Sequence, residues 1–238
     1  MKLDILALAA HPDDIELCAS GTLIKHQKMG YKVGIVDFTK GELGTRGTPE
    51  LRLEEAQKAG EIMKLSAREN LGFEDGHFPA DNHHKYEIIK VIRKFQPEVL
   101  MINAPNDRHP DHGRAHLVSK EAAFLSGLRK IETKINGENQ DPWRPKVVYS
   151  YIQGWFINPD FIVDISEEFD AKMESIMAYR SQFHDPSSSE PNTWLSSPDF
   201  FDLIKGRSVE FGQAIGGKYG EGFLTERWIG VNDIMNLK

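Results

Sequence analysis

The chain has 238 residues, of which 39% are apolar and 27% are charged, and its formal net charge is −7. This size and composition predict one folded domain over residues 1–238 with a sizeable core. An acidic surface repels phosphate backbones, which argues against a nucleic-acid partner, and no run of about 18 apolar residues exists that would predict a membrane span.

The first elements have the pattern of a parallel sheet. Residues 3–10 form an apolar run that predicts a strand covered on both faces. We expect a strand here and not a signal peptide, because Asp4 interrupts the run. Apolar residues at helical spacing predict a helix over 14–29 that ends at Gly30 as its C′ residue. A second strand over 32–39 completes a βαβ unit.

The same alternation continues along the chain. Thr48 and Pro49 predict the N-cap and first residue of a helix over 50–65, and Ser166 predicts the N-cap of a helix over 166–182. Further strands are expected over 67–73, 98–105, 146–152 and 161–166, and further helices over 84–95, 112–128 and about 199–212. The pattern predicts the α/β class with a mostly parallel, doubly wound sheet.

A polar segment, a glycine-rich segment and a single cysteine lie outside the strand and helix patterns. Residues 184–198 are polar and predict a surface loop, for which a plain connector ranks above a lid. The glycines in "AIGGKYGEGF" follow no predicted strand and do not match G-x-G-x-x-G, so they receive no phosphate-binding role. The single cysteine, Cys18, is expected in the core, and it excludes a disulfide framework and favours a cytoplasmic location.

Two His-Pro-Asp sequences follow two of the predicted strands. "HPDD" (11–14) directly follows the predicted strand over 3–10, and "NDRHPDH" (106–112) directly follows the predicted strand over 98–105. At about 5% usage per residue type, such a tripeptide is expected roughly 0.03 times in a chain of this length. Because the carboxyl ends of parallel strands meet at one edge, the two clusters should lie together.

Three residues of these clusters form a predicted metal site. His11, Asp14 and His112 supply the three protein ligands of a catalytic zinc site, and the fourth position stays open for water. The pKa of such a water falls towards about 7, which makes a nucleophile available at neutral pH. We expect one Zn²⁺ per chain, although the same ligands would accept Fe²⁺ or Co²⁺. The alternative is a turn-capping aspartate and ordinary surface histidines.

The neighbouring residues suit the chemistry of a hydrolase. Asp13 lies beside the ligands and is the expected general base, with a helix N-cap as its alternative role. Asp111 is expected to hydrogen-bond to His109 and favour its imidazolium form, which would stabilise an oxyanion or protonate a leaving amine.

Three further residues keep two readings each. Arg108 would either clamp a substrate carboxylate or pair with a nearby acid such as Asp107. Glu16 is either a first-turn helix residue or a group that supports the metal ligands. His116 is expected at the surface or behind those ligands, and the alternative is a ligand role, because it is four residues from His112 on a helix, a spacing that some metalloproteases use.

The motifs resemble those of the zinc-dependent N-acetylglucosaminyl deacetylases of the PIG-L/LmbE type. "AHPDDIE" and "RHPDH" carry the resemblance, together with "GTPELRLEEA" (47–56) and "YGEGF" (219–223), and it covers most of the chain. It implies a Rossmann-like, three-layer α/β/α fold. It also implies zinc on His11, Asp14 and His112, Asp13 as the base, His109 as the group that stabilises the oxyanion, and Asp111 as the residue that orients His109. It also implies that Arg52 contacts the substrate.

Within that family the chain resembles the bacillithiol type in its length and in all four motifs. Those enzymes remove acetate from N-acetylglucosaminyl-malate and are commonly homo-oligomers, often hexamers. Other small N-acetylglucosaminides, or the amide of a sugar–thiol conjugate, stay open as substrates. A metal-dependent phosphoesterase ranks well below, because only three clear ligands are present. A non-catalytic sugar- or nucleotide-binding module is the third reading.

Overall fold

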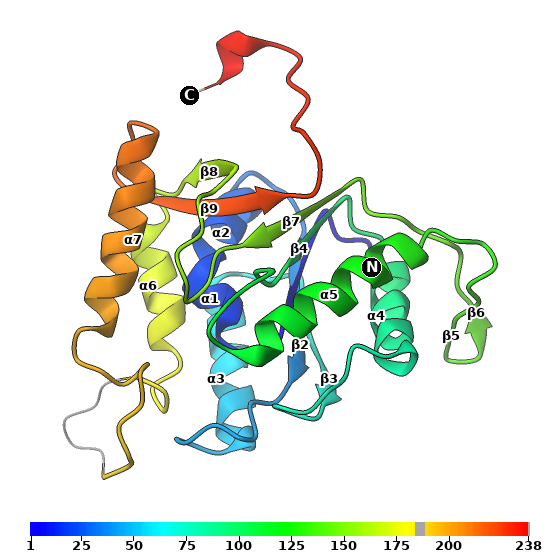
Figure 1. Cartoon of the computed structure of the whole chain (residues 1–238), viewed down its shortest axis with the longest axis horizontal. Helices are drawn as coiled ribbons and strands as arrows, with labels where there is room; N and C mark the ends of the chain where they lie inside the picture. Colours follow the sequence, from blue (N-terminus) through cyan, green and yellow to red (C-terminus); the bar gives the residue numbers. More distant parts are fainter. Residues whose placement is uncertain (184–188, 238) are drawn as a thin grey trace.

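The computed structural model describes residues 1–183 and 189–237. Its main sheet has seven strands in the order β3-β2-β1-β4-β7-β9-β8 (Figure 1). These strands are β1 (Ile5–Ala9), β2 (Val33–Thr39), β3 (Ala67–Phe73), β4 (Val99–Ile102), β7 (Val147–Tyr151), β8 (Phe161–Asp164) and β9 (Gly220–Thr225). The helices are α1 (Asp14–Cys18), α2 (Ser20–Lys28), α3 (Pro49–Ile62), α4 (Asn82–Phe95), α5 (Pro110–Leu125), α6 (Phe169–Met177) and α7 (Phe200–Ala214). A small hairpin of β5 (Lys134–Ile135) and β6 (Glu138–Asn139) and a short 3-10 helix, η1 (Ile234–Asn236), complete the described chain.

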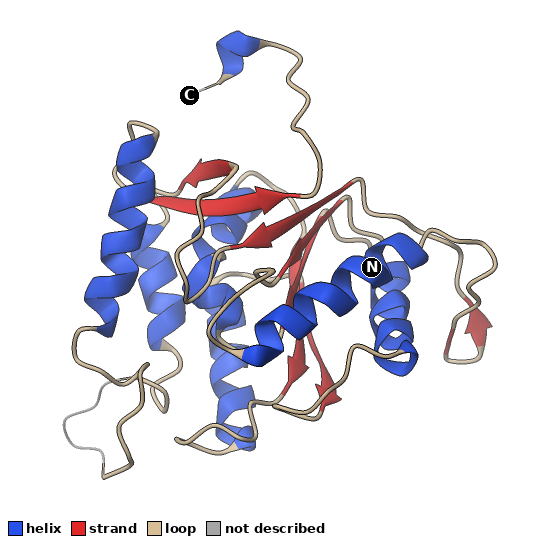
Figure 2. Ribbon diagram, viewed as in Figure 1, coloured by secondary structure: helices blue, strands red, loops and turns tan. Residues whose placement is uncertain are grey.

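The sheet is mostly parallel, and helices cover both of its faces (Figure 2), which confirms the predicted three-layer α/β/α fold. β1 lies at its centre, paired in parallel with β2 and β4. β9 runs antiparallel between β7 and β8. This strand was not predicted, because two glycines and a glutamate occupy its first three positions and these residues are depleted in strands.

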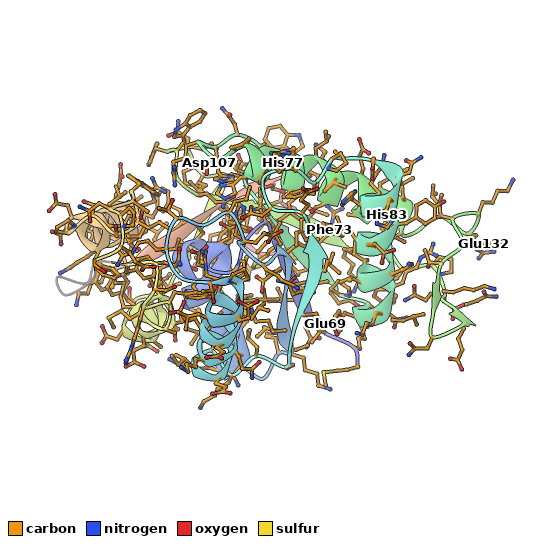
Figure 3. The ribbon with its side chains drawn as sticks, turned by 90° about the horizontal axis from the view of Figure 1, so that it is seen from below. Glu69, Phe73, His77, His83, Asp107 and Glu132 are labelled. Atoms are coloured by element: carbon orange, nitrogen blue, oxygen red, sulfur yellow. The ribbon has the colours of Figure 1, made fainter. Side chains whose placement is uncertain are left out.

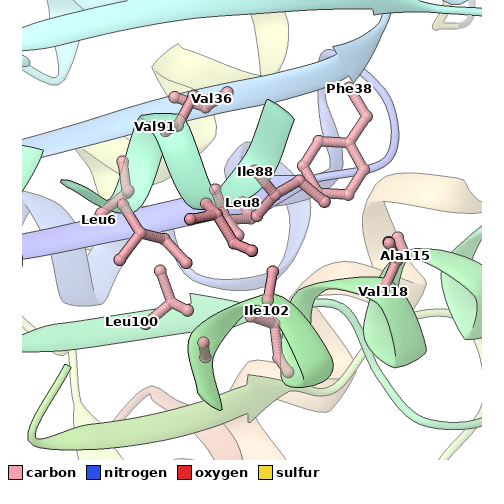
Figure 4. Packing of buried hydrophobic residues seen from close by; sticks show 14 of the residues in the cluster. Leu6, Leu8, Val36, Phe38, Ile88, Val91, Leu100, Ile102, Ala115 and Val118 are labelled. Atoms are coloured by element: carbon pink, nitrogen blue, oxygen red, sulfur yellow. The ribbon is translucent and has the colours of Figure 1, made fainter. Parts of the chain in front are cut away.

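Side chains alternate between the two faces of β1. Leu6 and Leu8 pack with Ile88 of α4 and Val118 of α5 in one buried cluster (Figure 4). Ile5, Ala7 and Ala9 face the opposite layer, where they pack in a second cluster with residues of α1 and α2. Burial on both faces explains why this strand is apolar throughout. In the described part of the chain, no helix combines the length and the apolar composition needed to cross a membrane.

The predicted helix over 14–29 is divided at Ala19, whose φ of −143° is not helical. The break is stabilised by a buried ion pair of 2.8 Å between Lys172 and Glu221. Lys172 donates to the carbonyl oxygens of Glu16 and Leu17 at the end of α1. Glu221 accepts from two backbone N–H groups in the first turn of α2. Both partners come from distant segments, so local sequence could not predict the break.

Several predicted helix ends agree with the structure. The Thr48 hydroxyl accepts from Leu51 N at 3.2 Å, and Pro49 is the first residue of α3. Gly30 follows α2 with a φ of +94°, a conformation that only glycine adopts without strain. The Ser166 prediction is wrong, because α6 begins three residues later and the Ser166 hydroxyl instead accepts from Lys218 N at 2.9 Å. Ser166 therefore ties this loop to the segment that leads into β9.

Candidate active site and metal centre

The two His-Pro-Asp clusters meet as predicted. β1 and β4 are neighbours in the sheet, and "HPDD" and "NDRHPDH" follow their carboxyl ends. His11, Asp13, Asp14, His109 and His112 line a cavity of about 390 Å³. A cavity of this size at this edge of an open α/β sheet is the usual position of a ligand site.

Asp14 is held firmly and faces the two predicted histidine ligands. Its Oδ2 accepts from His11 N and from the Asn103 side-chain amide, both at 3.0 Å. Its Oδ1 lies 3.1 Å from His112 Nε2, and its Oδ2 lies 3.8 Å from His11 Nδ1. Burial opposes ionisation of Asp14, but the two imidazoles outweigh it and lower the pKa of this carboxyl. The predicted ligands therefore converge around one carboxylate.

The other nitrogen of His11 contacts two further carboxylates. His11 Nε2 lies 3.0 Å from Asp75 Oδ1 and 3.3 Å from Asp111 Oδ2. Asp75 follows β3, so it reaches the same sheet edge from a third strand. It was not among the site residues predicted from the sequence. The rule that ligands bind beyond the carboxyl ends of parallel strands would have suggested it.

Within the described residues, two groups have ligand atoms that all lie within 4.8 Å of one another. One is His11, His109 and His112, and the other is His11, Asp75 and Asp111. The surrounding carboxylates raise the pKa of His11 to about 10 and that of His112 to about 9, although burial opposes both shifts. The site thus strongly favours positive charge, and its imidazole and carboxylate donors fit a divalent cation such as Zn²⁺.

Asp13 occupies an unusual backbone position beside this centre. Its φ is +113°, a value that costs a non-glycine residue about 1–3 kcal/mol and that is often found at active sites. Asp13 makes no side-chain cap to α1, so the helix N-cap reading of its carboxylate is wrong. Burial raises the pKa of Asp13 to about 7, against the opposing effect of Arg52. A carboxyl with this pKa suits a general base at neutral pH.

Arg52 is buried in the first half of α3 and donates to Asp13 Oδ2 at 2.6 Å and to the Pro12 carbonyl at 2.7 Å. It lines the cavity as well. The Arg52 guanidinium therefore forms an ion pair with the Asp13 carboxylate. Its predicted contact with substrate stays a prediction.

The predicted contact between the Asp111 carboxylate and His109 is not the one that the structure contains. The Asp111 carboxylate instead accepts from Gly76 N at 2.8 Å and contacts His11 and Arg114. The backbone N–H of Asp111 donates to His109 Nδ1 at 3.2 Å. The reason is that His109 precedes α5 as its N-cap, so backbone and not side-chain geometry sets its orientation.

The expected imidazolium form of His109 is also not favoured. Burial, together with the nearby His11 and His112, lowers the pKa of His109 to about 4. Because Nδ1 accepts a hydrogen bond, the proton of the neutral ring lies on Nε2. His109 therefore offers a neutral N–H donor to the cavity.

Asp107 supports His112 from behind. It lies on the loop between β4 and α5 (Figure 3), and its carboxylate contacts His112 Nδ1 and accepts from Trp155 N. Such a contact fixes the ring so that Nε2 faces the site. From the sequence, Asp107 was expected only as a possible partner of Arg108.

Replacing Asp107 with alanine is expected to weaken metal binding by about 10–100-fold, because His112 loses its orienting carboxylate. Titration with Zn²⁺ against a competing chelator measures this affinity. Asp141→Ala, at an exposed loop position, is the matched control. Equal affinities in the two variants would contradict the role of Asp107.

A buried ionic network underlies the HPDD turn. Glu16 is completely buried, and its carboxylate contacts Arg68 at 2.5 Å and the Tyr179 hydroxyl at 3.1 Å. Arg68 also contacts Asp37 on β2, at 2.9 Å. Glu16 lies in the first turn of α1, which agrees with the first of its two readings, and its carboxylate joins α1 to β3 and to the segment after α6.

Glu16→Ala should lower the free energy of unfolding by about 1–3 kcal/mol, because the buried Arg68 Nη1 and the Tyr179 hydroxyl lose an acceptor while Asp37 still pairs with Arg68. Denaturation by urea measures the loss. Glu61→Ala, at an exposed position of α3, should change stability by no more than about 0.5 kcal/mol. A Glu16 variant as stable as this control would refute the structural role of the network.

The remaining predicted residues lie around the cavity. Arg108 is exposed and stacks over Trp194, with 4.3 Å between the guanidinium carbon and the ring centroid. His116 is partly buried behind the site, 3.1 Å from the Asn103 carbonyl. Of the predicted loop over 184–198, residues 184–188 lie outside the described residues, while Trp194 lines the cavity.

Residues 6–123 match the model of the family described as PIG-L, GlcNAc-PI de-N-acetylase. The chain belongs to the PIG-L family. The matched segment contains both His-Pro-Asp clusters, so the resemblance seen in the motifs is confirmed.

Relatives of this PIG-L chain are mostly deacetylases. The diacetylchitobiose deacetylase of Thermococcus kodakarensis is 28% identical, over 92% of this chain and 81% of that protein. A probable N-acetyl-alpha-D-glucosaminyl L-malate deacetylase 2 of Bacillus cereus is 26% identical, over 76% of this chain and 84% of that protein. These relatives confirm the predicted enzyme class, a hydrolase of the deacetylase type.

Two further comparisons extend this result. The conserved protein TT1542 of Thermus thermophilus has a TM-score of 0.86 and 33% identity, over 96% of this chain and 97% of that chain. The 4-oxalmesaconate hydratase of Pseudomonas putida is 26% identical, over 75% of this chain and 74% of that protein. The second relative is named for a reaction other than deacetylation.

Proposed function

We propose that this PIG-L enzyme removes the acetyl group from N-acetylglucosaminyl-malate, in the bacillithiol pathway of the cytoplasm. The meeting of Asp13 with the His11, Asp14 and His112 donors in one cavity is the observation that carries the deacetylase assignment. The malate conjugate is supported by the motifs, by the relative from Bacillus cereus and by the exposed Arg108 beside the cavity, whose guanidinium suits a carboxylate.

The reaction adds water across an amide bond. The water oxygen bonds to the carbonyl carbon, the C–N bond breaks, acetate leaves and the sugar amine takes up a proton. In this proposal Asp13 accepts the proton of the attacking water and later passes it to the amine. The Nε2–H of neutral His109 donates to the developing oxyanion.

The proposal includes one divalent cation, most suitably Zn²⁺, on His11, Asp14 and His112. When bound, it would polarise the carbonyl and lower the pKa of water. Asp107 and Asn103 hold two of these ligands in place, through His112 and Asp14. Asp75 and Asp111 restrain the ring of His11.

The test is acetate release by the metal-loaded enzyme from N-acetylglucosaminyl-malate, with N-acetylglucosamine beside it. Preference for the malate conjugate is the expected result. Equal or faster turnover of the plain sugar would keep the deacetylase chemistry and refute the malate assignment. If neither is hydrolysed, the assay moves to a sugar–thiol conjugate amide, a phosphoester and an oxalmesaconate-type substrate.

We also propose that the chain forms a homo-oligomer, with a hexamer as the expected state. The C-terminal arm after β9 extends away from the sheet (Figure 1), and its Trp228, Ile234 and Met235 are 97%, 77% and 83% exposed. Exposed apolar side chains at this density favour burial in a second copy.

A chain shortened after Arg227 should therefore lose its assembly. Light scattering should give a multiple of 27.0 kDa for the full chain and a smaller multiple for the shortened one. Lys238→Ala, which keeps the apolar arm, serves as the control. A full chain that runs as a monomer would refute the proposal.

A further inference from the structure

The cavity extends beyond the histidines and aspartates into the space between α1 and α7. Its lining there contains six apolar residues beside Lys172, Arg207, Ser208 and Glu221. The apolar residues that line it are Leu17, Cys18, Phe200, Leu203, Ile204 and Phe211. We call this part of the cavity the apolar compartment. Leu17 and Cys18 lie about one helical turn after Asp13 and Asp14, at the end of α1, so the compartment adjoins the site of the proposed chemistry.

The charged groups that border the compartment already have partners. Lys172 lies 2.8 Å from Glu221 and also donates to two carbonyl oxygens of α1. Arg207 donates to the carbonyl oxygens of Gln153 and Gly154. These contacts use the three N–H bonds of the Lys172 ammonium and two N–H groups of Arg207 within the protein, and Glu221 is itself an anion. A carboxylate of the substrate therefore suits the Arg108 side of the cavity instead.

A ligand that fills only the polar part of the cavity would leave apolar walls in contact with water. Water is poorly held by such walls, because it needs two to four polar partners. An apolar group would displace this water and gain from burial. Leu17 and Cys18 are both partly accessible although they lie beside the core, which is consistent with an opening to the cavity.

We propose that the apolar compartment binds an apolar group carried by the amino-sugar substrate. This inference rests on the deacetylase chemistry of the proposed function and not on the malate conjugate, which carries no such group, so the compartment predicts a second class of substrate beside it. The group could come from either of two parts of the substrate, an N-acyl chain longer than acetyl or an apolar aglycone. Both present the same chemistry to the compartment, and the experiment separates them.

The test compares two pairs of substrates with the metal-loaded enzyme. One pair is N-hexanoylglucosamine and N-acetylglucosamine, and the other is hexyl and methyl N-acetylglucosaminide. The longer member of at least one pair should have a kcat/KM at least about tenfold higher. The first pair identifies the acyl chain and the second identifies the aglycone. A preference in neither pair overturns the inference.

Ile204→Trp should fill the compartment and bring the preferred ratio down to about one. Lys205→Trp adds the same bulk at the next residue of α7, which is exposed and does not line the cavity, so the ratio should stay as in the wild type. Leu203→Trp, at a position that is 41% exposed, is the second variant if Ile204→Trp fails to fold. Equal ratios in the filled variant and the control would overturn the inference.

Failure of the proposed function has a different signature. An enzyme that releases acetate from no sugar refutes the deacetylase assignment for these substrates. Calorimetric titration with hexyl and methyl N-acetylglucosaminide and with N-hexanoylglucosamine then tests the compartment without turnover. At least about tenfold tighter binding of a hexyl or hexanoyl compound, lost in Leu203→Trp or Ile204→Trp, would support it, and equal binding would overturn it.

Discussion

Asp13→Asn should lower kcat/KM for acetate release by about 10²–10⁴-fold while the metal stays bound. The amide cannot accept the proton of the attacking water, but it keeps the size of the side chain and an oxygen for Arg52, which donates to Asp13 at 2.6 Å. Kinetics with N-acetylglucosaminyl-malate and metal analysis of the same samples measure the two effects separately.

The matched control is Asp81→Asn. Asp81 caps α4 through a hydrogen bond from His84 N at 3.0 Å, and asparagine caps helices equally well. This variant should keep its activity. An Asp13→Asn enzyme within about tenfold of wild type would show that another group is the base, and loss of metal from it would show that Asp13 is a ligand.

The pH profile provides a further check on Asp13. The base must be ionised, so activity should rise as pH rises through its pKa. Burial raises this pKa to about 7 before any cation is considered, and a nearby cation lowers it. The acidic limb of kcat/KM should therefore lie below pH 7 for the metal-loaded enzyme and disappear in Asp13→Asn.

Removal of the metal should lower kcat/KM for acetate release at least about 10³-fold, because several kcal/mol of transition-state stabilisation are lost. Dialysis against a chelator tests this, and addition of Zn²⁺ should restore the rate. His112→Ala should bind less than one equivalent of metal even when Zn²⁺ is in excess. His83→Ala, at an exposed position, should behave as the wild type.

The same measurement distinguishes between the ligand sets. Asp14 contacts both His11 and His112, whereas Asp75 and Asp111 share the other nitrogen of His11. If the proposed set is right, Asp14→Ala loses the metal and Asp75→Ala only weakens its binding. The reverse result would place the ion in the group of His11, Asp75 and Asp111.

Local sequence determined the elements and the position of the site. The apolar run before His11 and the one before Asn106 predicted two parallel strands, and the carboxyl ends of adjacent parallel strands lie at one sheet edge. This rule alone predicted that the two His-Pro-Asp clusters lie side by side, without information on any tertiary contact. Thr48 and Gly30 marked helix ends because their capping interactions involve only nearby residues.

Only the tertiary structure decided which atoms meet within the site. Asp75 reaches His11 from a third strand, 64 residues away in sequence, and the break at Ala19 depends on Lys172 and Glu221. The Asp111 carboxylate points to His11 and not to His109 because the backbone at the start of α5 sets its direction. Residue types thus indicate the chemistry of this site, but long-range packing fixes its hydrogen bonds, because those partners have no regular spacing along the chain.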